Sequence, residues 1–295
     1  MLLEVIYNTG GSTFLENFIG SFIGTITALI IFVLESRRER NKSRKERKEN
    51  YKSALIYFQL LLTNIIKVVG KQVIAYRDHS ENIKNDPLNF HLLQLYITQD
   101  IDRILNKLDQ ERLFQAYLQE FGNSIEVIKE FKEIISIMDY FNSIISQVTT
   151  SQEKYLTELH DNLVKYKDIS EEDVLKGCIM ILENIRNSTS DYKKNNVYAS
   201  LNAIVVNYHD TSPNPPTVEH IQASLITTLT NTILEQLRSE PEIFEIADDC
   251  RRATWLFNDI KFKATIVANE FNAHYEGMKS ALKQLEALDR IIKLT

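Results

Sequence analysis

Two His-Asp dipeptides are the clearest candidates for chemistry in this sequence, His160–Asp161 and His209–Asp210. Imidazole and carboxylate groups together can hold a divalent metal ion that activates water. A metal centre of this kind needs a further histidine upstream, which His91 could supply. However, a chain with six histidines forms such dipeptides readily by chance. These five residues therefore define a metal site only as an alternative interpretation.

Other catalytic patterns are absent from the sequence. It has no Gly-rich phosphate loop, no H-E-x-x-H zinc motif and no G-x-S-x-G nucleophile turn. Cys178 lies in an apolar context and Cys250 beside charged residues, and neither has a local base, so we expect both to be buried or incidental. The sequence predicts a protein that is not an enzyme and needs no cofactor or metal. A membrane-anchored metal-dependent phosphohydrolase is kept as an alternative.

Trp255 is the only tryptophan and stands among cationic and aromatic residues. An indole next to Arg251 and Arg252 could stack on a nucleotide. More commonly such a tryptophan packs in the core while its charged neighbours extend outward. We therefore expect Trp255 to be a core residue.

The elements that would position these residues begin with an uncharged apolar run at residues 18–34, FIGSFIGTITALIIFVL. As a helix its 17 residues extend about 25 Å, close to the thickness of a bilayer core. Eight basic residues follow it directly: Arg37, Arg38, Arg40, Lys42, Arg44, Lys45, Arg47 and Lys48. No Lys or Arg precedes the run. This asymmetry predicts an uncleaved single-pass anchor in the cell (inner) membrane, with the N-terminus outside and the C-terminal domain in the cytoplasm.

The basic segment also separates the charges of the chain. Residues 35–50 carry a net charge of +4. Because the whole chain carries −6, the remaining residues carry −10. We expect the eight basic side chains to bind anionic lipid headgroups and the acidic remainder to stay clear of them. Membrane lipids are therefore predicted partners, and nucleic acid is not expected.

One face of the predicted span carries small residues, Gly20, Gly24, Thr27 and Ala28. Small residues at this spacing let two membrane helices approach closely. Glycine is also frequent in membrane helices without such a role. The pattern favours a homo-oligomer that assembles through the transmembrane helix.

The rest of the chain has the pattern of successive amphipathic helices. Apolar residues recur three or four apart from Leu55 to Val73, and the Asn85–Pro87 segment interrupts them. Helix starts are predicted at Thr98, Asp109, Asn123 or Ser124, Ser170 and Thr217, and Gly122 is predicted to end a helix. Residues 197–206 form a short helix or a strand, and the Pro-rich segment from His209 to Thr217 is the clearest loop.

These observations predict an all-α protein with a single N-terminal transmembrane helix, a charged helical stalk and a cytoplasmic multi-helix bundle. The expected divisions are a tail at 1–13, the span at 14–35, the basic stalk at 36–53 and one helical domain at 54–295, which residues 208–217 could subdivide. Only eight glycines and five prolines argue against turn-rich β folds.

In layout the chain resembles bacterial membrane-anchored accessory proteins, including some effectors of anti-phage defence. The resemblance implies a cytoplasmic domain that senses a protein partner or a ligand, and a span that responds by oligomerising and perturbing the bilayer. The alternative is a passive tether, or scaffold, that recruits a cytoplasmic protein partner to the membrane.

Overall fold

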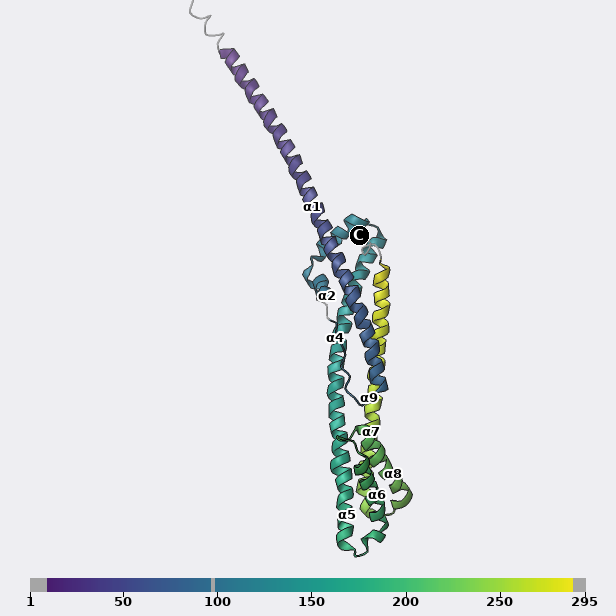
Figure 1. Ribbon diagram of the computed structural model, residues 1–295. Helices are drawn as coiled ribbons and strands as arrows, with labels where there is room; N and C mark the ends of the chain where they lie inside the picture. Colours follow the sequence, from purple (N-terminus) through teal and green to yellow (C-terminus); the bar gives the residue numbers. More distant parts are fainter. Residues whose placement is uncertain (1–9, 97–98, 289–295) are drawn as a thin grey trace, which may run out of the picture.

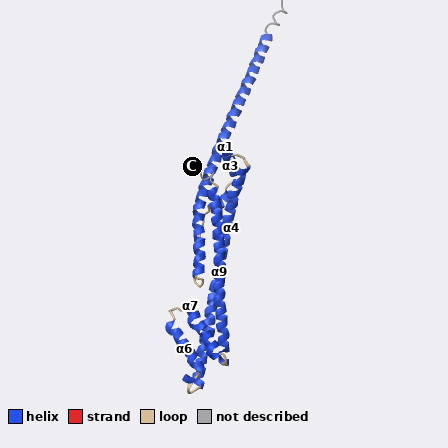
Figure 2. Ribbon diagram, turned by 90° about the vertical axis from the view of Figure 1, so that its right-hand side faces the viewer, coloured by secondary structure: helices blue, strands red, loops and turns tan. Residues whose placement is uncertain are grey.

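The computed structural model describes residues 10–96 and 99–288, with side chains from residue 27 onward. Within these ranges the secondary structure is helical and contains no β-strand, as Figure 2 shows. The helices form an elongated rod, and the first helix projects far beyond one end of it (Figure 1). The predicted all-α fold is confirmed.

Helix α1 (Gly10–Asn85) joins the apolar run, the basic stalk and the bundle in one unbroken helix of 76 residues, about 114 Å long. This continuity confirms the prediction of a helical stalk. From residue 27 to residue 50 no side chain is buried, and the first core residue is Leu55. The helix ends where predicted, because Pro87 disfavours helical geometry in the residue before it.

In the half of the rod that α1 enters, α1 packs mainly against the C-terminal half of α9 (Phe244–Ala287), and α4 (Ile125–Asp168) also packs against α9. Side chains join α1 to α4, as where the ring of Phe58 lies beside that of Phe131. Three short elements complete this half: α2 (Asp100–Asp102), the π-helical turn η1 (Arg103–Lys107) and α3 (Gln110–Phe121). Asp109 caps α3 by accepting a hydrogen bond from the Arg112 backbone N at 2.9 Å, and Gly122 ends it with φ 96°. The predicted cap at Thr98 lies outside the described residues.

The far half of the rod lies beyond the end of α1. There α4 continues without a break through the π-helical segment η2 (Ile169–Leu175) into α5 (Lys176–Ser188). The chain returns through η3 (Tyr192–Lys194), α6 (Asn196–Thr211), α7 (Val218–His220), η4 (Ile221–Thr227), α8 (Thr228–Thr232), η5 (Ile233–Leu237) and η6 (Pro241–Ile243) to α9. Thr217 caps α7 as predicted, by accepting a hydrogen bond from the His220 backbone N at 3.2 Å.

Two local predictions are wrong. Ser170 does not begin a helix but lies fully buried inside the continuous helix 125–188, because the apolar face formed by Tyr166, Val174 and Cys178 continues on both sides of it. The Pro-rich loop begins after Thr211 and not at His209, since α6 extends through both His209 and Asp210. Residues 197–206 belong to α6 and are helical.

An extended strap, residues 86–96, leads from the end of α1 back along the rod and is fixed by two glutamines. Gln72 of α1 accepts a hydrogen bond from the Tyr96 backbone N at 2.6 Å and donates one to the Gln94 carbonyl at 3.2 Å. Gln152 of α4 donates to the His91 carbonyl at 2.9 Å, and its Oε1 lies 2.7 Å from His79 Nε2. The strap therefore joins α1 to α4 through buried polar contacts.

Candidate functional site

The five candidate metal ligands are all described, and the structure does not assemble them into a metal centre. His91 lies in the strap with Nε2 2.7 Å from the Asp86 carbonyl, and His160 lies toward the C-terminal end of α4 with its ring 6.3 Å from that of Phe90. His209 and Asp210 lie at the end of α6 in the far half. Among the described His, Cys, Asp and Glu side chains, no group of three could hold a metal ion.

Both cysteines are buried, as expected from their sequence context. Burial raises the pKa of the Cys178 thiol to about 12, and it has the same effect on the pKa of Cys250. A thiol with such a pKa carries almost no thiolate at neutral pH. Neither cysteine therefore has the environment of a nucleophile.

Trp255 lies on the surface, so the prediction of a core tryptophan is wrong. Its side chain is 67% exposed, while its neighbours Ala253 and Leu256 are buried. The buried face of α9 in this region is formed by Ile246, Cys250, Ala253 and Ile260, at the spacing of one helix face. Trp255 falls outside that series, and this spacing is the sequence signal that would have shown it.

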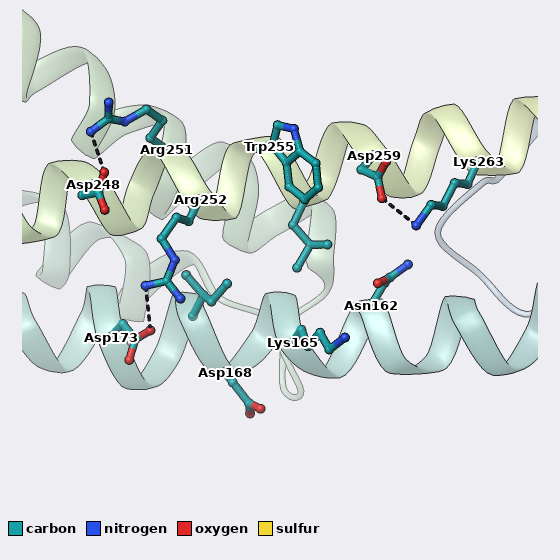
Figure 3. A pocket seen from close by; sticks show the side chains of 12 residues that line it. Asn162, Lys165, Asp168, Asp173, Asp248, Arg251, Arg252, Trp255, Asp259 and Lys263 are labelled. Atoms are coloured by element: carbon teal, nitrogen blue, oxygen red, sulfur yellow. Dashed lines mark hydrogen bonds and ion pairs between the residues drawn. The ribbon is translucent and has the colours of Figure 1, made fainter.

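A groove of about 880 Å³ opens between α9 and the helix formed by α4 and η2, next to Trp255 (Figure 3). Charged side chains of both signs line it, and most are paired. Arg251 contacts Asp248 at 2.6 Å, Arg252 contacts Asp249 at 2.7 Å and Asp173 at 3.8 Å, and Lys263 contacts Asp259 at 2.9 Å. The groove therefore presents no large excess of either charge, and its apolar lining consists of Trp255, Leu256 and Ile169.

A second groove, of about 690 Å³, also borders Trp255 and has only two charged residues in its lining, Arg238 and Arg251. The exposed side chains of Leu234 and Phe244 line it, together with Thr254 and Asn258. Trp255 and Arg251 line both grooves. The tryptophan thus stands as a ridge between two hollows, an arrangement suited to contact with another molecule.

At the other end of the molecule, the last part of the uncharged run is exposed over the whole circumference of α1. Six consecutive large apolar residues, Leu29 to Leu34, are between 39% and 70% exposed. Burying side chains of this kind is worth about 1.5–3 kcal/mol each, so leaving all six in water forgoes on the order of 10 kcal/mol. A bilayer would cover them on every side.

By length and composition, one helix among the described side chains could cross a membrane, Thr27–Asn85 of α1. Its most apolar window is 39% buried and therefore lies in the part of α1 that packs in the rod, because residues 27–50 carry no buried side chain. Core helices meet the same criterion. The exposed residues Leu29–Leu34 carry the argument for a membrane span.

The basic stalk projects freely from the rod. All eight predicted lipid-binding residues, from Arg37 to Lys48, are exposed, and Lys42 lies 4.0 Å from Glu46 on the next turn. Of the predicted packing face, Thr27 and Ala28 are exposed. Gly20 and Gly24 belong to α1, but they lie outside the residues whose side chains are described.

Comparison of the chain with protein-family models, with curated proteins and with solved structures finds no match.

Proposed function

We propose that this chain is a non-enzymatic, single-pass membrane protein of the inner membrane that works as an oligomerising effector. The observation that carries the proposal is the continuity of α1 from the exposed apolar residues through the basic stalk into the core. A helix without a break transmits displacement or rotation of the rod to the span. A flexible linker would not do so.

The orientation follows from charge. The eight basic residues lie on the side of the apolar run that leads to the rod, which supports a cytoplasmic rod and an outer N-terminus. From Glu35 to Asn50 the basic segment rises about 24 Å, so the acidic bundle is held beyond the Debye length of the headgroup charges. Contact with anionic lipid is then confined to the stalk.

The test is the membrane potential of cells in which the protein is induced. Assembly of spans through Gly20 and Gly24 should depolarise the membrane, and replacing both glycines by leucine should abolish the effect. Phe22→Leu is the matched control, because Phe22 lies between the two glycines and off their face. It should leave depolarisation unchanged.

A passive tether and an effector predict different results when the span is replaced by an unrelated one. If residues 14–35 are replaced by an unrelated single span and full depolarisation remains, the effector mechanism is wrong. If the protein still performs its role in the cell after the exchange, without any depolarisation, the passive-tether hypothesis is correct. Its partner would then be identified from the proteins retained by the rod.

A further inference from the structure

The outward face of α9 changes character along its length. In the far half of the rod it carries Phe244, Trp255, Phe262 and Ile266, which are between 51% and 67% exposed. Their positions, i, i+11, i+18 and i+22, fall within about 40° of one another at 100° per residue. They form a straight stripe about 33 Å long, parallel to the axis of the rod.

The same face is polar or small in the half of the rod that α1 enters. There Asn269, Ala273 and Ser280 are exposed at positions in phase with Phe262. Between Phe244 and Trp255 the same face also carries Asp248 and Arg251, which pair with each other at 2.6 Å. The face therefore changes from large apolar residues beside this ion pair to small and polar residues within a few turns. A face that met only water along its whole length would not need this change.

We propose that the stripe on α9 (Phe244, Trp255, Phe262 and Ile266) is the surface on which a second copy of this chain docks, side by side and parallel. This inference deepens the proposed function and rests on it. Two chains anchored in one membrane present their stripes at the same height, so that each residue of the stripe meets its own counterpart across a two-fold axis.

The charges beside the stripe are unequally divided between its two edges. Asp248, Arg252, Asp259 and Lys263 follow one edge, while the other edge carries Ala247, Thr254, Asn258 and one charged residue, Arg251. In a parallel two-fold pair, one edge faces the opposite edge of the partner. Arg251 then faces one charge of each sign, Asp248 and Arg252 of the other copy, within one helical turn, so the edge charges do not oppose the pairing.

The shape of the surface around Trp255 fits the proposed pairing. Trp255 separates two grooves of about 880 Å³ and 690 Å³, both in the size range that holds small organic molecules. Across a two-fold axis, each indole can enter a groove beside the other. Together with Leu234, which is 62% exposed, the stripe has five apolar side chains of about 200 Å² each. Because these side chains are between 51% and 67% exposed, they offer about 600 Å² of apolar surface per copy.

Two such surfaces bury about 1,200 Å², the lower limit for a stable specific interface. Association of this strength is reversible in dilute solution and is favoured when both chains share a membrane, because anchoring raises their effective concentration. The membrane and the stripe therefore act together in assembly.

The test is cysteine crosslinking of the full-length protein in its own membranes. Arg251→Cys and Asn269→Cys lie five helical turns apart on the same face of α9. In a parallel pair each variant alone forms a crosslinked dimer. Cys178 and Cys250 are buried and give little background.

Adding Trp255→Glu and Phe262→Glu to the Arg251→Cys variant should lower the crosslinked fraction about tenfold or more, because central aromatic contacts dominate interfaces. The matched control adds Leu92→Glu and Met180→Glu, which place the same charges on exposed apolar positions elsewhere. The control should crosslink normally. Thermal unfolding of both proteins verifies that the rod is folded.

The proposal is overturned if neither cysteine gives a dimer, if only other proteins are crosslinked, or if the glutamates at Trp255 and Phe262 change nothing. Its failure is distinct from failure of the proposed function. If no crosslinks form but depolarisation still depends on Gly20 and Gly24, the spans assemble and the α9 stripe is not an interface. If crosslinks form but the membrane is not depolarised, the α9 interface is supported and the effector function is wrong.

Discussion

At the scale of single residues, His79 is a buried base held neutral. Its ring lies 4.6 Å from that of Phe271, and Nε2 donates to Gln152 Oε1. Desolvation lowers the pKa of His79; the hydrogen bond to Gln152 opposes this shift and the charge of His91 adds to it. The folded protein therefore binds fewer protons at this site than the unfolded chain does in mildly acidic solution.

The rod should therefore lose stability as the pH falls through about 6.5, the ordinary pKa of histidine, and regain it on return to neutral pH. His79→Gln keeps a donor near Gln152 and removes the titration. The drop in thermal midpoint between pH 7 and pH 5 should be smaller in this variant than in the wild type. His209→Gln, on the exposed end of α6, is the control, and a drop as large as in the wild type for His79→Gln would contradict the assignment.

Trp255 shows why residue type alone does not settle burial. Tryptophan is usually well buried, yet the core side of α9 in this region is formed by Ile246, Cys250, Ala253 and Ile260. Trp255 lies outside this series on the helix and is therefore exposed. The position of Trp255 on the helix predicts its exposure correctly, whereas its residue type does not.

At the scale of elements, Gly70 in α1 can be replaced by alanine without strain, whereas Gly122 after α3 cannot. A Cβ on Gly70 would meet only Leu282 Cδ2, at 3.8 Å, so alanine fits there without a clash. At Gly122 space is free, but φ is 96° and ψ is 174°, a conformation that side chains resist. The two positions therefore differ in backbone conformation and not in crowding.

Gly70→Ala should raise the free energy of unfolding by about 0.5–1 kcal/mol, because alanine favours the helix and makes the unfolded chain less flexible. Gly122→Ala should lower it by about 1–3 kcal/mol. Chemical denaturation of both variants beside the wild type gives the two values. Effects of the same sign would contradict the local backbone at one of the two sites.

The sequence predicts most of the elements, because their signals are local. Asp109, Ser124 and Thr217 cap the helices that they were expected to begin, and Pro87 lies just beyond the end of α1. The failure at Ser170 has a tertiary cause, since a capping pattern inside a continuous apolar face stays helical. The grooves beside Trp255 were not predictable, because they form between segments far apart in sequence.

At the scale of the whole molecule, the continuous helix 125–188 sets the length of the rod. Its 64 residues extend about 96 Å, so the end near α5 stands roughly 120 Å from the apolar run once the stalk is included. Met180 on α5 is 62% exposed and marks this far end. It is a good position from which to test the topology.

In spheroplasts, a cysteine at Met180 should react with a membrane-impermeant maleimide only after permeabilisation, whereas Ser12→Cys in the predicted tail should react at once. The buried native cysteines Cys178 and Cys250 keep the background low. Labelling of Met180→Cys in intact spheroplasts would place the rod outside. The pair of variants thus reads the orientation from both ends of the chain.

The unbroken α1 also fixes the rotation of the apolar residues Leu29–Leu34 relative to the bundle. Each residue added to the stalk turns the span by about 100° relative to the rod while moving it only about 1.5 Å. Seven added residues nearly restore the angle and lengthen the stalk by about 10 Å, whereas two residues turn the span by about 200°. In the proposed dimer, the number of residues between Glu35 and Asn50 would therefore set which face of each span meets its neighbour.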